Sequence, residues 1–117
     1  MLFDELFDPS ASEETPIACD PSAHTENELK DHDQKVEGLL ADREEMRKVS
    51  GGYAFRFPAR WDWVERIFDV VRYERKCCPF LTFGIAFEPE ERGIWLYIGG
   101  NEEVEEYLVE AAEELDA

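Results

Sequence analysis

Residues 81–98 read LTFGIAFEPEERGIWLYI, and the alternation in this stretch determines the fold class that we expect. Large apolar side chains occupy every second position of its first part: Leu81, Phe83, Ile85 and Phe87. A period of two is typical of a β-strand that buries one face. A polar connection at 88–93 separates this strand from a second apolar run at 94–98. The two runs therefore predict antiparallel strands joined as a hairpin with a long loop.

The sequence before this hairpin predicts a strand followed by a helix. Residues 53–57 alternate in the same way, and Pro58 should end that strand because proline cannot donate to a ladder. Residues 61–77 instead carry apolar side chains at helical spacing: Val64, Ile67, Phe68 and Val71. Pro79 disfavours the helical region for the residue before it, so we expect this helix to end near Cys77.

Two further helices are predicted, one on each side of these elements. Thr25 followed by Glu28 matches a capping box, which satisfies the first N–H groups of a helix. Apolar residues at spacings of three and four continue from there to Met46, so we expect one helix that runs until the glycine pair at 51–52. Asn101 is a good N-cap for the last helix.

This order of elements is typical of an α+β domain with two layers. We expect an antiparallel sheet of three strands covered by three helices. A short fourth strand at residues 17–19 would extend the sheet at its edge. Residues 16–117 would form this single domain, and residues 1–15 would be a flexible acidic arm.

The charge of the chain excludes several classes of partner. It has 29 Asp+Glu against 12 Lys+Arg and a formal net charge of −17, so we expect no nucleic-acid partner. No apolar run approaches the roughly 20 residues of a membrane span, so we expect no membrane partner either. Residues 1–9 carry acids and no Lys or Arg, which does not match a secretory signal. The acidity indicates either a basic protein partner or a cytoplasm rich in salt, as in a halophile.

Residues 43–76 are the exception, with nine bases and six acids. One interpretation is an anion site, and the other is that these bases offset the acids of the chain itself. The arginines in question are Arg56, Arg60, Arg66, Arg72 and Arg75.

The adjacent Cys77 and Cys78 are the most informative pair, and Cys19 is the only other cysteine. Their spacing matches neither a C-x-x-C redox pair nor a common zinc motif, and a bridge between neighbours would be strained. Three interpretations remain open: buried packing, a soft-metal or metalloid site with three thiolates, and a reactive thiol. Because the dipole at a helix C-terminus disfavours a thiolate, the reactive thiol is the least favoured of the three interpretations.

His32 lies on the apolar stripe of the first helix, where it is a further candidate metal ligand or a satisfied interface histidine. No nucleotide-binding fingerprint or Ser/His/Asp set is present. We therefore expect no hydride transfer, phosphoryl transfer or hydrolysis, and no cofactor other than a soft metal or metalloid ion.

Four segments together resemble a group of small uncharacterised prokaryotic proteins: residues 17–19, 52–58, 74–80 and 94–96. The group carries an E-R-x-C-C-P-F signature, here Glu74 to Phe80, and an upstream cysteine in an I-A-C segment. Its members often have Gly-Pro-Glu-Gly where this chain has Gly-Gly-Asn-Glu at 99–102. No activity is established for the group. The resemblance implies that Cys19, Cys77 and Cys78 belong to one motif.

The functional hypothesis is therefore a cytoplasmic protein that binds or senses a soft ion through Cys77 and Cys78 with Cys19. The alternative is a non-catalytic interaction module in which the cysteines are buried packing residues. A homodimer is one interpretation of the surplus of large aromatic side chains. Those side chains are Trp61, Trp63, Trp95 and Tyr97.

Overall fold

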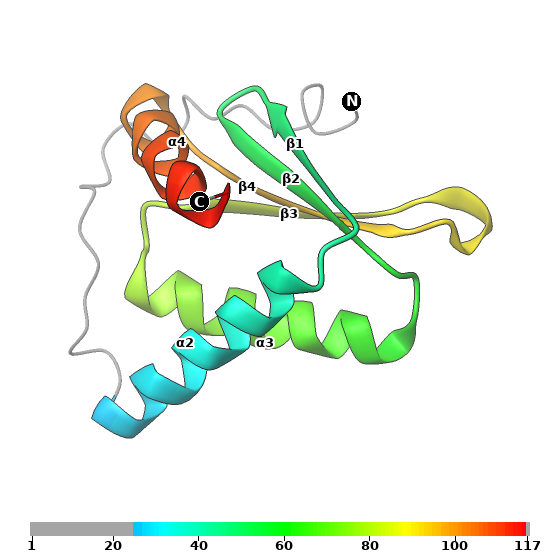
Figure 1. Cartoon of the computed structure of the whole chain (residues 1–117), viewed down its shortest axis with the longest axis horizontal. Coiled ribbons are helices and arrows are strands. Elements are labelled where there is room, and N and C mark those ends of the chain that lie inside the picture. The colour runs from blue at the N-terminus through cyan, green and yellow to red at the C-terminus, as the bar shows by residue number, and fades with distance from the viewer. Residues whose placement is uncertain (1–24, 117) are drawn as a thin grey trace.

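The computed structural model describes residues 25–116 (Figure 1). The regular elements follow one another as α2 (Glu26–Ala41), β1 (Glu45–Val49), β2 (Gly52–Phe57), α3 (Trp61–Cys77), β3 (Thr82–Phe87), a short 3₁₀ turn (Pro89–Glu91), β4 (Ile94–Gly99) and α4 (Glu102–Asp116). The expected arm at 1–15 and the expected strand at 17–19 lie outside the described residues.

The four strands form one antiparallel sheet in the order β1-β2-β4-β3. The hairpin of β3 and β4 is present as predicted, with Phe87 opposite Ile94 at its loop end. β2 pairs with β4, so the two central strands are distant in sequence. The α+β class with an antiparallel sheet is therefore confirmed.

All three helices lie against the same face of the sheet, which gives two layers. α2 and α3 pack side by side along one part of this face (Figure 1). α4 covers the other part, where Leu108 and Ala112 line an apolar cleft of about 140 Å³ together with Tyr53 and Phe55 of β2. None of the helices described between residues 25 and 116 is long and apolar enough to cross a membrane.

The predicted extent of the first helix is wrong. α2 ends at Ala41, and Met46 belongs to the edge strand β1 rather than to a helical stripe. Residues 45–49 are rich in helix formers, but β1 pairs along its whole length with β2 from Val49 opposite Gly52. Gly51 makes this tight turn possible because its φ is 81°, a left-handed value that glycine adopts at little cost. The glycine pair is thus a hairpin turn and not a helix stop.

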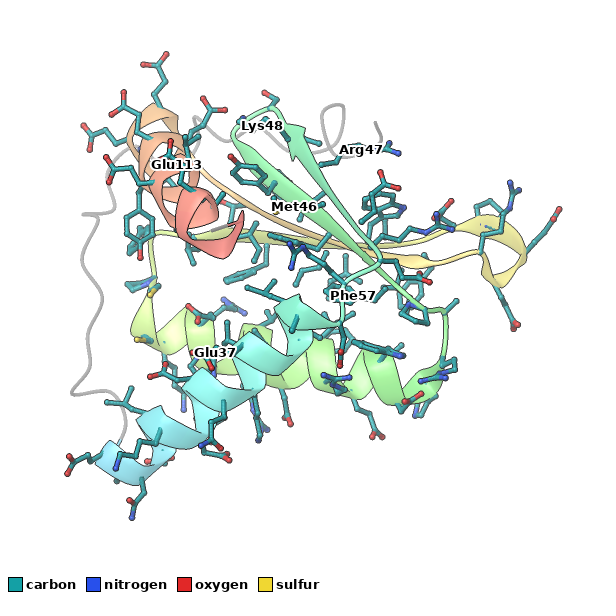
Figure 2. The ribbon with its side chains drawn as sticks, viewed as in Figure 1. Glu37, Met46, Arg47, Lys48, Phe57 and Glu113 are labelled. Carbon is teal, nitrogen blue, oxygen red and sulfur yellow. The ribbon has the colours of Figure 1, made fainter. Side chains whose placement is uncertain are left out.

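The main core lies between the sheet and α2 and α3. Phe57, Ile67 and Leu96 are almost fully buried there, and Figure 2 shows Phe57 between the sheet and α3. The Phe57 ring stacks on Trp63, with centroids 5.4 Å apart. A second group of buried residues, which includes Trp95 and Tyr97, lies on the opposite face of the sheet. The small Ala54 of β2 packs beside them.

Candidate functional site

The two adjacent cysteines lie where α3 ends. Cys77 is the last helical residue, and Cys78 is the C-cap with φ −126° and ψ 74°. The Cys78 N–H still donates to the carbonyl of Glu74 at 2.7 Å, which completes the last turn. Helical conformation stops before Pro79, as the sequence predicts, because the proline ring disfavours it in the preceding residue. Two consecutive thiols therefore start from different backbone conformations.

The cysteines also differ in their surroundings. Cys78 is 7% exposed and packs with Phe80 and with Val104 of α4, whereas Cys77 is half-buried at the border of the same cluster. No disulfide joins the two. The thiol pair thus lies at the junction of α3 and α4, and any group bound there would contact both helices.

His32 of α2 packs against the turn of α3 that leads to these cysteines. Its side chain is 3% exposed, and Nε2 lies 2.9 Å from Oε1 of Glu74. The ring stacks on Tyr73 with centroids 5.1 Å apart. Tyr73 and Glu74 precede Cys77 by four and three residues, and such positions are neighbours on a helix surface. His32 therefore contacts the helical turn that precedes the thiol pair, although 45 residues separate it from Cys77 in the sequence.

The contacts of His32 leave one ring nitrogen available. Because the carboxylate of Glu74 accepts from Nε2–H, the lone pair of a neutral ring lies on Nδ1. Nδ1 is buried and has no hydrogen-bond partner. A histidine whose other nitrogen donates to a carboxylate is the usual arrangement of a metal ligand. The ring is also well placed as a buried interface residue, so both sequence interpretations remain.

The described residues alone do not form a metal site. No group of three His, Cys, Asp or Glu side chains among residues 25–116 could hold an ion together. The third predicted thiol, Cys19, lies outside the described residues. Cys77, Cys78 and His32 are therefore not gathered into one ligand group within the described part of the chain.

Arg75 and Lys76 are the charged residues next to the thiols. Both are exposed, and neither forms an ion pair with any residue of the described part of the chain. The Lys76 side chain lines a hollow of about 190 Å³ together with Tyr73 and Glu28. The end of α3 thus carries two exposed bases that form no ion pair within the described residues.

The other arginines of residues 43–76 are mostly neutralised by nearby acids. The ion pairs are Arg56–Glu88 (3.4 Å), Arg60–Asp62 (3.2 Å), Arg66–Asp42 (3.3 Å) and Arg72–Asp69 (3.1 Å). Arg60, Arg66 and Arg72 lie along α3 or at its N-cap, Arg56 lies on β2, and each of the four pairs with a different acid. The contacts support the interpretation that the arginines offset the acids of the chain.

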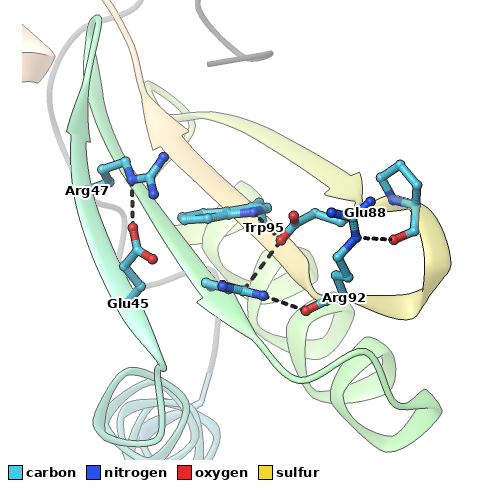
Figure 3. Close-up of polar contacts among 7 residues, drawn as sticks. Glu45, Arg47, Glu88, Arg92 and Trp95 are labelled. Atoms are coloured by element: carbon cyan, nitrogen blue, oxygen red, sulfur yellow. Dashed lines mark hydrogen bonds and ion pairs between the residues drawn. The ribbon is translucent and has the colours of Figure 1, made fainter.

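One polar cluster, which no sequence pattern predicted, lies on the sheet face opposite the helices. Figure 3 shows Trp95 of β4 between Arg47 and Glu88, with Nε1 of the indole donating to Glu88 at 2.9 Å. The Arg47 guanidinium lies 5.0 Å from the centre of the indole ring. Arg56 donates to the carbonyl of Arg92 at 2.6 Å and so ties β2 to the β3–β4 loop. Each charged group is paired, which is typical of a structural cluster.

No protein-family model, curated protein or solved structure matches the chain. A functional conclusion therefore depends on the chemistry of the residues themselves.

Proposed function

We propose that the protein binds a soft metal ion or a metalloid through Cys77 and Cys78, with Cys19 as the third ligand. The observation that supports this most directly is the end of α3 between the two cysteines. On a continuous helix, adjacent side chains diverge by about 100°. The non-helical conformation of Cys78 removes that constraint, so both sulfur atoms can approach one ion. Thiolates are the ligands that soft cations prefer.

The charges near the pair favour its anionic form once an ion is present. A helix C-terminus disfavours negative charge, and the exposed Arg75 and Lys76 offset this effect. A bound cation deprotonates its thiol ligands, so metal uptake would release protons. We further propose that the protein acts in the cytoplasm, where thiols stay reduced.

Arsenite and mercury distinguish a three-thiol site from a two-thiol site. Arsenite, As(OH)₃, condenses with three thiols and releases three water molecules, whereas Hg²⁺ is satisfied by two thiolates. We expect the reduced full-length chain to bind one arsenite. Binding should be lost in each of the variants Cys19→Ser, Cys77→Ser and Cys78→Ser, as measured by calorimetry and intact mass. Mercury binding should persist in Cys19→Ser.

A histidine variant is the matched control. His32→Phe preserves the stack on Tyr73 and all three thiols, so it should bind arsenite as the wild type does. If His32 is a zinc ligand, the same variant should weaken zinc binding by about tenfold or more. Arsenite binding that is absent from the wild type, or that is unchanged in all three serine variants, would refute the thiol site.

The second candidate function is an interaction module with a basic partner. It is favoured by the outer surface of α4, where five glutamates are exposed: Glu102, Glu103, Glu106, Glu110 and Glu113. The burial of Cys78 in the core agrees with a packing role for the cysteines. A Lys/Arg-rich synthetic peptide should then bind the wild type and the Cys77→Ser variant equally. Binding should fall when Glu103, Glu106 and Glu110 are changed to Gln, and equal binding by that variant would contradict this function.

A further inference from the structure

The outward face of α3 carries two large aromatic side chains. Trp61 is 75% exposed and Phe68 is 53% exposed, and a separation of seven residues places them on the same side of the helix. The sequence assigned Phe68 to the buried stripe of α3, and this assignment is wrong. Of the aromatic residues that suggested a dimer, Trp63, Trp95 and Tyr97 are buried, which leaves Trp61 as the exposed one.

The charges on this face divide into two halves. Glu65 lies in its N-terminal half and the bases lie in its C-terminal half, with Phe68 between the halves. The basic half consists of Arg72, Arg75 and Lys76, which line a hollow of about 480 Å³ with Phe68 and Val71, and Arg72 also pairs with Asp69 of its own helix. Glu65, Arg75 and Lys76 form no ion pair within the described residues. The face is therefore complementary in charge to a copy of itself turned end to end.

We propose that two copies of the chain associate through this face, as a dimer in which the two α3 helices run antiparallel. A two-fold axis between positions 68 and 69 places Glu65 opposite Arg72 of the second copy. This pair occurs twice, as the symmetry of an isologous interface requires.

The aromatic residues fit the same register. Phe68 lies next to the axis, where it fills the hollow beside Val71 of the second copy. Trp61 comes opposite Lys76 of the second copy, within reach of a cation–π contact. In this arrangement the two helix dipoles are antiparallel, which is favourable. A parallel arrangement would instead place Arg72 and Arg75 beside the same residues of the second copy, and these like charges would repel.

Within the described residues, the packing of α2 leaves Trp61 and Phe68 exposed, although Glu28 of α2 lines a hollow with Arg72 and Lys76. α2 contacts α3 through residues on another side of the helix, as in the ion pairs of Arg66 with Asp42 and of Lys35 with Asp69. A helix of 17 residues is roughly 25 Å long. A contact along one such helix buries an area at the small end of the range known for protein interfaces. With a net charge of −17 on each copy, the dimer should be weak and should depend on concentration and salt.

Sedimentation velocity of the full-length chain at about 0.15 M salt tests the interface. The wild type should shift from monomer to dimer as its concentration rises. Phe68→Glu should remain monomeric, because it places two like charges beside the axis. Phe87→Glu is the matched control: Phe87 is 61% exposed but lies on β3, and this variant should dimerise as the wild type does. A monomeric wild type, or an equal loss in both variants, would overturn the proposal.

Charge reversal tests the register and does not depend on Phe68. Glu65→Arg and Arg72→Glu should each weaken dimerisation by about tenfold or more, because each brings like charges together twice. The double variant restores opposite charges at both places and should dimerise nearly as the wild type does. A double variant that dimerises no better than the single variants would show that this register is wrong. Circular dichroism of each variant confirms that it is folded.

Discussion

Nε2 of His32 lies 2.9 Å from Oε1 of Glu74, and this contact joins the middle of α2 to the last turns of α3. The ring stacks on Tyr73 in the same turn, so His32 is held in place by two neighbouring residues. A buried polar group is costly unless it is hydrogen-bonded, and Glu74 is the partner that satisfies Nε2. This contact adds to the apolar packing and the ion pairs that hold α2 against α3.

Replacing Glu74 should therefore destabilise the fold. Glu74→Ala leaves Nε2 of His32 buried without a partner, and we expect a loss of about 1–3 kcal/mol in the free energy of unfolding. Urea denaturation measures it. Glu37→Ala on α2 is the control, because Glu37 is exposed and lies outside the proposed dimer face, and it should change stability by less than about 0.5 kcal/mol. Equal losses in the two variants would mean that the buried contact contributes nothing specific.

Replacing either of two glycines with alanine should change the stability of the fold, but in opposite directions. Gly51 has φ 81°, so Gly51→Ala should lower stability by about 1–2 kcal/mol through strain in the β1–β2 turn. Gly38 lies inside α2, where an added Cβ would meet Arg66 Nη2 at an ordinary 3.8 Å. Gly38→Ala should raise stability by about 0.5–1 kcal/mol because alanine favours helix. Thermal unfolding that shifts in the same direction for both variants would contradict this account.

Glu105 should make stability depend on pH. A hydrogen bond from Lys48 Nζ at 2.7 Å lowers the pKa of this carboxyl below its ordinary value of 4.5, assisted by the Gly51 N–H and opposed by partial burial. Figure 2 shows Lys48 near the β1–β2 turn, which this contact ties to α4. Since the folded pKa is the lower one, the stabilisation is complete above pH 4.5 and is lost as the pH falls through the folded pKa.

The variant Glu105→Gln isolates this effect. Urea denaturation from pH 7 to pH 3 should show the wild type more stable than the variant at neutral pH, with a difference that shrinks in acid. Glu103→Gln provides the comparison on the same helix, since Glu103 is exposed and forms no ion pair within the described residues. A difference between wild type and Glu105→Gln that stays constant over this range would exclude the titration of Glu105 as its cause.

Local sequence patterns predicted most of the fold. The strands at 53–57 and 94–98, the capping box at Thr25 and the end of α3 before Pro79 all follow from signals within a few residues. β1 was missed because residues 45–49 have helix-forming side chains, and only pairing with β2 makes them a strand. Long-range pairing of this kind leaves a weak local signal.

The candidate site was predictable in its residue types but not in its contacts. Spacing singled out Cys77 and Cys78, and the apolar stripe singled out His32. The partnership of His32 with Glu74 depends on how α2 crosses α3, which no local pattern encodes. The exposure of Phe68 was missed because helical periodicity cannot separate the edge of a buried stripe from its centre.

The two adjacent cysteines should also differ in their effect on folding. Cys78 is buried against Phe80 and Val104, so Cys78→Ser places a hydroxyl in an apolar cluster and should cost about 1–3 kcal/mol. Cys77 is half-buried, and Cys77→Ser should cost less than about 1 kcal/mol. Chemical denaturation of the reduced, metal-free chain measures both values. Cys78→Ala, which adds no polar group, should be less destabilising than Cys78→Ser. If the two serine variants lose equally little free energy of unfolding, Cys78 does not contribute to the packing at the α3–α4 junction as its burial indicates.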